Sequence, residues 1–106
     1  MEKITSFEQF EQAKQGEKVV FQFSANWCPD CRFLDMFFQE IIDENKDFTF
    51  YYVDRDQFIE VCQNLDIFGI PSFVAFNKGE EIGRYVNKDR KTKEQVEEFL
   101  EGLRGK

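Results

Sequence analysis

Two cysteines separated by two residues are the part of this sequence best suited to chemistry. Cys28 and Cys31 enclose Pro29 and Asp30. Two thiols at this spacing can exchange electrons with a disulfide, or they can supply half of a zinc site. A zinc site needs two further ligands, but the chain offers only one more cysteine, Cys62, and no histidine. The pattern therefore favours dithiol redox chemistry, and no metal site is predicted.

The segments on either side of the cysteines predict a strand-to-helix junction. Residues 18–24 form a short apolar run of β-branched and aromatic residues, typical of a buried strand. Residues 29–46 carry apolar residues at helical spacing, and Pro29 suits the first turn of that helix. The free N–H groups and the dipole of a helix N-terminus favour a thiolate, so we expect Cys28 to be the attacking thiol. We expect Cys31, one turn later, to be the resolving thiol.

Length and composition predict one acidic domain that spans residues 1–106. The chain includes 14 phenylalanines, which supply a single core generously. Its 14 basic and 21 acidic residues give a net charge of −7, which argues against nucleic acid and anionic membranes as partners. No stretch approaches the roughly 18 apolar residues that cross a bilayer, and the start carries no signal-like region. We therefore expect a cytoplasmic monomer.

The remaining pattern predicts an α/β fold. Further strands are expected at 48–53, 72–76 and 81–86. Further helices are expected from Ser6 to Gly16, over 57–65, and from Thr92 to Leu103, with capping boxes that pair Ser6 with Gln9 and Thr92 with Gln95. Residues 77–80 suit a hairpin turn, so the last two strands should be antiparallel, whereas the strand, helix and strand before them imply a parallel pair. We predict a central mixed sheet of four to five strands, a βαβ unit plus a β-hairpin, flanked by four helices.

The sequence resembles the thioredoxin family over about residues 18–103. The resemblance rests on Trp27-Cys28-x-x-Cys31 after a strand, on Ile70-Pro71 further along, and on the Lys78-Gly79-Glu80 turn. It implies a thioredoxin fold with a cis bond before Pro71, and an enzyme that reduces protein disulfides without a bound cofactor. It also implies that Trp27 covers the cysteines as an aromatic lid and that Ile70 and Pro71 bind the substrate backbone. Electrons are then expected from a thioredoxin-reductase-like flavoprotein.

Three positions depart from the family pattern. Pro29-Asp30 replaces the common Gly-Pro, as in a Cys-Pro-Asp-Cys subgroup of thioredoxin-like proteins, and the Asp30 anion opposes a nearby thiolate. Gln22 stands where the family usually buries an aspartate, so water or Asp30 must accept the proton of the resolving cysteine. Asn87 replaces a glycine, which is expected to narrow the substrate groove. Gln22 suits a satisfied buried amide as well as a catalytic role, and Asp30 suits a helix-end carboxylate as well as a proton shuttle.

The sequence leaves two alternative functions open. The departures at Gln22, Asp30 and Asn87 favour a specialised reductase of low-molecular-weight or mixed disulfides. The other alternative is a non-catalytic binding module that holds a partner at the Ile70-Pro71 edge. Cys62 lies at an apolar helical position, where a core residue is a simpler interpretation than a regulatory thiol.

Overall fold

The computed structural model describes residues 1–105, which form five strands and five helices. The strands are β1 (Glu2–Lys3), β2 (Val19–Ser24), β3 (Thr49–Asp54), β4 (Ser72–Asn77) and β5 (Glu80–Tyr85). The helices are α1 (Phe7–Ala13), α2 (Pro29–Asp35), α3 (Phe38–Glu44), α4 (Ile59–Asn64) and α5 (Lys93–Arg104). This order confirms the predicted α/β class, with a strand-helix-strand unit followed by a hairpin.

All five strands form one mixed sheet in the order β1-β3-β2-β4-β5. β3 pairs in parallel with β1 and β2, whereas β4 runs antiparallel to β2 and β5. The register places Gln22 of β2 between Tyr52 of β3 and Phe73 of β4. The parallel unit and the hairpin are as predicted. The two residues of β1 are too few to show an alternating pattern, so this strand could not be predicted.

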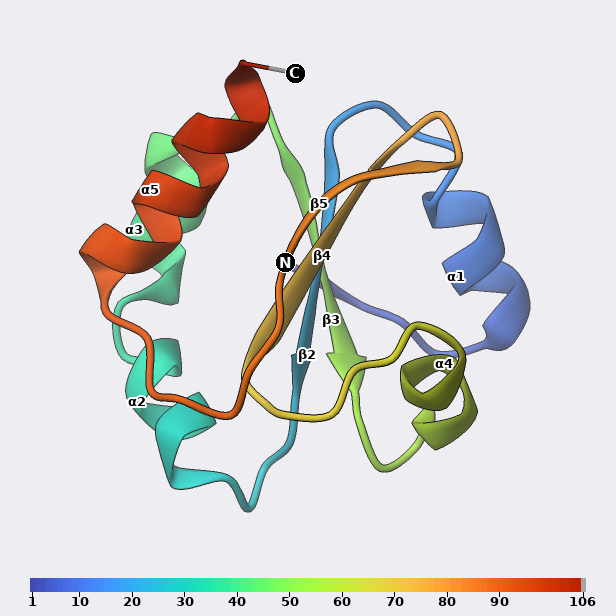
Figure 1. Cartoon of the computed structure of the whole chain (residues 1–106), viewed down its shortest axis with the longest axis horizontal. Coiled ribbons are helices and arrows are strands. Elements are labelled where there is room, and N and C mark those ends of the chain that lie inside the picture. The colour runs from blue at the N-terminus through green and yellow to red at the C-terminus, as the bar shows by residue number, and fades with distance from the viewer. Residues whose placement is uncertain (106) are drawn as a thin grey trace.

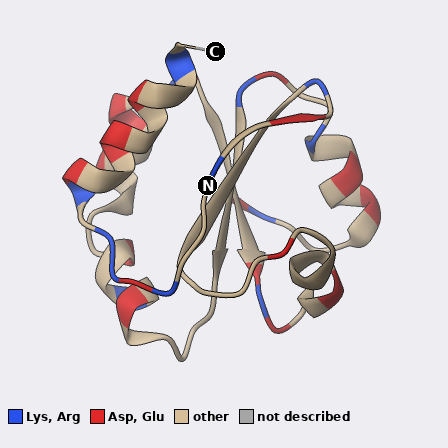
Figure 2. Ribbon diagram, in the orientation of Figure 1, with Lys and Arg blue, Asp and Glu red and all other residues tan. Residues whose placement is uncertain are grey.

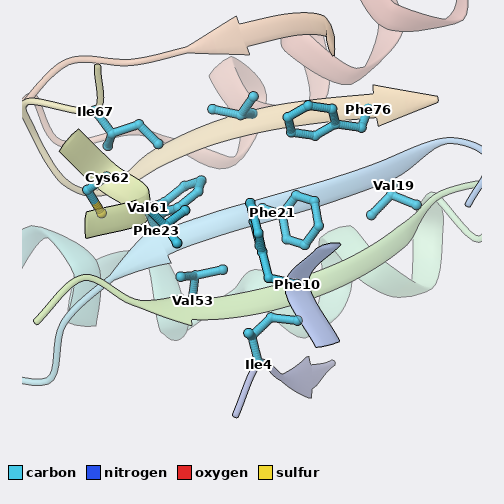
Figure 3. Close-up of a cluster of buried hydrophobic side chains, with 11 residues drawn as sticks. Ile4, Phe10, Val19, Phe21, Phe23, Val53, Val61, Cys62, Ile67 and Phe76 are labelled. Carbon is cyan, nitrogen blue, oxygen red and sulfur yellow. The ribbon is translucent and has the colours of Figure 1, made fainter. Parts of the chain in front are cut away.

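Helices cover both faces of the sheet: α1 and α4 lie on one face, and α2, α3 and α5 lie on the other (Figure 1). Each face has its own core, because successive side chains of a strand point to opposite faces. The core beneath α1 and α4 includes Ile4, Phe10, Phe21, Phe23, Val53, Cys62 and Phe76 (Figure 3). The core on the other face includes Val20, Leu34, Phe38, Phe50, Phe73 and Leu100.

The prediction of a single helix over 29–46 is wrong, because the structure has two shorter helices there, α2 and α3. The two residues between Asp35 and Phe38 donate their N–H groups to carbonyls three residues earlier, at 3.2 Å each, which tightens and ends the first helix. α3 then places the ring of Phe38 against Phe50 and Phe73. Apolar spacing continues across this bend and therefore does not reveal it. The sheet is flanked by five helices rather than four.

The predicted capping boxes formed to different extents. Thr92 Oγ1 accepts a hydrogen bond from the Gln95 N–H at 3.2 Å, and Gln95 Oε1 accepts one from the Thr92 N–H at 2.9 Å, so this box is complete. At α1, Ser6 Oγ accepts from the Gln9 N–H at 3.1 Å. The Gln9 side chain, however, accepts from the Thr5 N–H instead of from Ser6, so only half of the first box is present.

Charged residues occur along the helices and in the loops (Figure 2). Acidic residues recur along α1 and α5, whereas the loop between β5 and α5, beside α2, carries both signs of charge (Figure 2). Within residues 1–105, no helix has both the length and the apolar character that crossing a bilayer requires.

Candidate active site

Cys28 occupies the N-cap position of α2. Its backbone is extended, with φ −85° and ψ 114°, and Pro29 follows at the start of the helix, where a missing N–H costs no intrahelical bond. The Sγ atom of Cys28 accepts a hydrogen bond from the backbone N–H of Cys31 at 3.3 Å. A helix N–H therefore points at the sulfur of the predicted nucleophile, in the place where an N-cap oxygen usually accepts.

Cys31 lies one turn deeper than Cys28. Cys28 keeps 6% of its surface exposed, whereas Cys31 has none. Burial raises the pKa of the Cys31 thiol to about 12; the adjacent Cys28 thiol adds to the rise, and the nearby Ser24 hydroxyl opposes it. Both thiols are free. Cys31 therefore holds its proton at neutral pH, and a resolving step must remove that proton.

The Ile70–Pro71 peptide bond lies beside the two cysteines and is cis, as the resemblance implies. Ile70 packs against the small buried group formed by Ala25, Cys28 and Cys31. Its carbonyl oxygen is 4.0 Å from Cys28 Sγ. The backbone of this loop is therefore next to the sulfur that would attack a substrate.

A groove of about 280 Å³ opens beside Cys28. Its lining includes Trp27, Cys28, Arg55, Phe68, Ile70 and Lys88. The aromatic side chains of Trp27 and Phe68 are 59% and 76% exposed. The Trp27 indole N–H donates to the Asp56 carboxylate at 2.6 Å, which fixes the ring at the groove. Trp27 thus borders the predicted site, whereas Phe68 was missed because a single aromatic residue next to Ile67 resembles a core position.

The loop that ends at Gly69 touches the loop that follows β5. A Cβ atom on Gly69 would lie 2.6 Å from the backbone nitrogen of Lys88 and 2.7 Å from the carbonyl carbon of Asn87. Such an approach requires a residue without a side chain. The Asn87 side chain is bound within its own loop, where its Oδ1 accepts from Lys91 Nζ at 2.8 Å. The two backbones themselves therefore border this end of the groove.

Asp30 is bonded to a residue far along the sequence. Arg90, in the loop between β5 and α5, donates from Nε to Oδ1 of Asp30 at 2.8 Å. The Arg90 guanidinium also lies 4.3 Å from the centre of the Phe33 ring, so it contacts α2 twice. The sequence pattern over 87–93 indicates only a charged loop and gives no sign of these contacts. The Asp30 carboxylate is thus held from outside the helix, by a cation.

Lys91 is a second residue of this loop that the sequence did not reveal. The residue is fully buried. Its Nζ donates to Asn87 Oδ1 and to the Asp89 carbonyl, both at 2.8 Å, and lies 5.0 Å from the centre of the Tyr85 ring. Burial lowers the pKa of this amine, and the surrounding acidic groups and thiols oppose that shift. A lysine within a run of charged residues usually predicts a solvated side chain, so the burial of Lys91 could not be predicted from the sequence.

Gln22 lies on β2, fully buried. Within the described part of the chain, neither its amide oxygen nor its amide nitrogen has a hydrogen-bond partner, and the same is true of the Ser24 hydroxyl. The interpretation of Gln22 as a satisfied buried amide therefore stays a prediction, which would need a water as the partner. Where the family that this sequence resembles usually has an aspartate, this structure has Gln22, whose side chain has no hydrogen-bond partner among residues 1–105.

Cys62 lies on the opposite face of the sheet from Cys31. It is 1% exposed within the apolar core beneath α1 and α4 (Figure 3). Burial raises the pKa of the Cys62 thiol to about 11. The core position expected for this cysteine is confirmed. Across residues 1–105, the side chains of Cys, Asp and Glu form no group of three or more that could bind a metal ion.

Comparison with known proteins gives a consistent result. A family model described as Thioredoxin matches residues 2–102. Mitochondrial thioredoxin-2 of Schizosaccharomyces pombe is 32% identical over 84% of this chain and 68% of its own length. Thioredoxin of Mycoplasmoides gallisepticum is 38% identical over 74% of this chain and 80% of its own. The crystal structure of Malassezia sympodialis thioredoxin superposes with a TM-score of 0.82 at 30% identity, covering 96% of this chain and 91% of that one.

Proposed function

Because this chain belongs to the thioredoxin family and is a thiol-disulfide oxidoreductase, we propose that it reduces protein disulfides with Cys28 as attacking thiol and Cys31 as resolving thiol. The observation that carries this assignment of roles is the position of the Cys28 sulfur at the N-cap of α2, with the Cys31 N–H 3.3 Å away. Cys28 also borders the groove, whereas Cys31 is fully buried. A substrate sulfur therefore reaches Cys28 first.

The proposed reaction transfers two electrons from the dithiol to the substrate disulfide. The Cys28 thiolate attacks one substrate sulfur, the substrate S–S bond breaks, and the first substrate thiol leaves after taking up a proton. Cys31 then loses its proton, and its sulfur attacks Cys28 Sγ. The bond between Cys28 and the second substrate sulfur breaks, so the second thiol leaves in the same way. The protein is left with a Cys28–Cys31 disulfide.

The substrate backbone is proposed to bind at the loop that holds Ile70 and Pro71. The Ile70 carbonyl lies 4.0 Å from Cys28 Sγ, so a strand that pairs with this loop brings its own sulfur to the cysteine. Main-chain pairing tolerates different side chains, which suits an enzyme with many protein substrates. The exposed rings of Trp27 and Phe68 add apolar contacts around such a strand.

The oxidised dithiol needs an external reductant. We assign that role to a thioredoxin-reductase-like flavoprotein, so the chain itself requires no bound cofactor. We also propose that the protein acts as a monomer in the cytoplasm, since an unpaired buried thiol such as Cys62 persists best in a reducing compartment. Reduction by purified flavoprotein and NADPH, gel filtration and cell fractionation test these three proposals separately.

Insulin reduction tests the assignment of the nucleophile. The pre-reduced protein should cleave the interchain disulfides of insulin, which is followed by turbidity, whereas the Cys28→Ser variant should be inactive. Circular dichroism of both proteins shows whether the substitution leaves the fold intact. A Cys28→Ser variant that reduces insulin as fast as the parent would exclude Cys28 as the attacking thiol.

Reduction of small or mixed disulfides is a second candidate function, and the rim of the groove favours it. Arg55 and Lys88 both line the groove, in a chain whose net charge is −7. Such a rim suits a small disulfide that carries carboxylates, such as oxidised glutathione. The measurement is kcat/KM for oxidised glutathione and for insulin, in the parent and in Lys88→Gln. A strong preference for insulin, unchanged in the variant, would count against this candidate.

A further inference from the structure

Two buried polar side chains lie beneath the dithiol without a partner. Gln22 and Ser24 point to the same face of the sheet, because they are two residues apart on β2. Both are fully buried, and Gln22 Oε1, Gln22 Nε2 and Ser24 Oγ have no hydrogen-bond partner within the described chain. Such groups cost stability, so their presence in this place calls for a function. The Ser24 hydroxyl is close enough to Cys31 to influence its thiol.

Asp35 closes the other end of this polar region. It lies four residues after Cys31 on α2, which places the two side chains on one face of the helix. Burial raises the pKa of the Asp35 carboxyl. The Arg32 charge and the nearby Gln22 amide oppose that rise, because both favour the ionised carboxylate. Asp35 is nevertheless exposed on its outer side, so its carboxylate can exchange a proton with solvent.

Tyr52 of β3 borders the same region. It stands opposite Gln22 in the parallel register and therefore shares its face of the sheet. Burial raises the pKa of Tyr52, the nearby Ser24 hydroxyl opposes that rise, and the charges of Asp54, Asp35 and Cys31 add to it. Tyr52 thus stays neutral at physiological pH. The charged group that acts on Asp35 is Arg32, on its own helix.

Asp30 is the competing proton acceptor, but its surroundings differ from those of Asp35. Its Oδ1 accepts from Arg90 at 2.8 Å, so the carboxylate is directed to the loop between β5 and α5. Asp35 instead adjoins the unpartnered amide on the sheet side of α2.

We propose that Asp35 accepts the proton of Cys31 during the resolving step, through one bridging water held by Ser24 and Gln22. The proposal rests on the proposed function, because it needs a mixed disulfide on Cys28. The Cys31 proton passes through the water to the Asp35 carboxylate. The Cys31 sulfur then displaces the substrate thiolate from Cys28 Sγ, closing the Cys28–Cys31 bond, and Asp35 returns the proton to solvent while the released thiolate takes one up. Asp35 acts here through the water, as a positioned proton acceptor in a chain that has Gln22 where the family usually buries an aspartate.

Stopped-flow reaction with dithiobis-nitrobenzoate separates the two steps. The reduced protein releases one coloured thiolate when Cys28 attacks, at a rate proportional to reagent concentration, and a second when Cys31 resolves the mixed disulfide, at a rate independent of it. In Asp35→Asn, we expect the first phase to be unchanged within about twofold and the second to slow by about tenfold or more at pH 7. The parent's second phase should rise with pH to a plateau as Asp35 ionises. In Asp35→Asn that plateau should be replaced by a rate that increases in proportion to hydroxide.

Three matched variants make the outcome decisive. Asp35→Glu keeps a carboxylate and should restore the second phase and its plateau. Asp43→Asn removes a carboxylate elsewhere and should leave both intact, whereas Asp30→Asn tests the competing acceptor. The proposal is overturned if Asp35→Asn retains the parental second phase and pH profile, or if Asp30→Asn loses them instead. A parent without any first phase would refute the proposed function itself, which is a distinguishable result.

Discussion

The two faces of the sheet surround a buried cysteine in different ways. Cys62 on one face and Cys31 on the other are each at most 1% exposed, and burial is the main reason why the pKa of each thiol is raised. Cys62 lies among apolar side chains (Figure 3). Cys31 has a second sulfur and the polar side chains of β2 beside it. Burial therefore keeps both thiols protonated, and only the neighbours of Cys31 provide a partner and a route for the proton.

The two faces also differ in how they contribute to stability. Beneath α1 and α4, aromatic rings pack closely, with Phe10 and Phe21 at 4.6 Å between ring centres. Beneath α2, the fully buried Gln22 has no hydrogen-bond partner among residues 1–105. An unsatisfied buried polar group typically costs about 1–3 kcal/mol. We infer that the polar position at Gln22 gives up stability for chemistry, on a face that otherwise has an apolar core of its own.

The largest contrast should appear when each buried cysteine is replaced. Cys31→Ser removes the resolving sulfur, so the mixed disulfide on Cys28 should accumulate and insulin reduction should stop after one equivalent. Cys62→Ala removes a thiol of similar burial from the apolar core and should keep full activity, with a loss of about 1 kcal/mol in stability. Mass spectrometry of trapped adducts and insulin turbidity measure both effects. Equal loss of activity in the two variants would remove the functional distinction between the faces.

The next contrast concerns stability at neighbouring positions of β2 that point to opposite faces. Phe21→Ala should lower the free energy of unfolding by about 3–5 kcal/mol, because it opens a cavity beneath α1. Gln22→Leu should leave it within about 1 kcal/mol of the parent, because the substitution removes both the buried amide and the water proposed to bind it. Gln22→Leu should also slow the second phase of the dithiobis-nitrobenzoate reaction. Urea unfolding gives the two free energies, and a Gln22→Leu variant more stable than the parent by about 1–3 kcal/mol would show that no water satisfies the amide.

Most of the architecture could be predicted because it depends on local periodicity. The strands with β-branched and aromatic residues, the cap at Thr92 and the hairpin turn all follow from residues close together in the sequence. The bend between α2 and α3 could not, because the packing of Phe38 against Phe50 and Phe73 is a tertiary contact. Apolar periodicity shows which residues are buried, but it does not show which residues they pack against.

The site, like the fold, could be predicted only where local sequence patterns determine it. Cys28 and Cys31 stand out by spacing, and Ile70-Pro71 by resemblance. Arg90 and Asp30 are 60 positions apart in the sequence, so no local pattern predicts that they form an ion pair. Asp35 is similarly concealed: an acidic residue on the polar side of an amphipathic helix predicts a solvated side chain, and only the fold brings Gln22 to it. Long-range polar contacts are thus the part of this site that sequence reasoning missed.

The smallest effect is expected from the ion pair between Asp47 and Arg104, at the rim of the face that holds the dithiol. Arg104 donates to both carboxylate oxygens of Asp47 at 2.8 Å, which lowers the pKa of that carboxyl to about 2. The Asp47 side chain is 37% exposed, so solvent screening limits the contribution to about 0.5 kcal/mol. A depressed pKa in the folded state stabilises the protein above the unfolded pKa of about 3.9, and this contribution is lost as pH falls toward about 2.

Asp47→Asn should therefore lower the free energy of unfolding at pH 7 by about 0.5 kcal/mol, and the difference from the parent should disappear near pH 2. Added salt should reduce it at pH 7, because the pair is partly exposed. Asp43→Asn, which removes the same charge from α3 without breaking this pair, is the matched control for net charge. Urea unfolding at both pH values provides the measurement. If the loss of stability at pH 2 equals that at pH 7, Asp47 stabilises the fold by packing rather than by charge. Its contribution would then resemble that of the apolar core beneath α1 and α4.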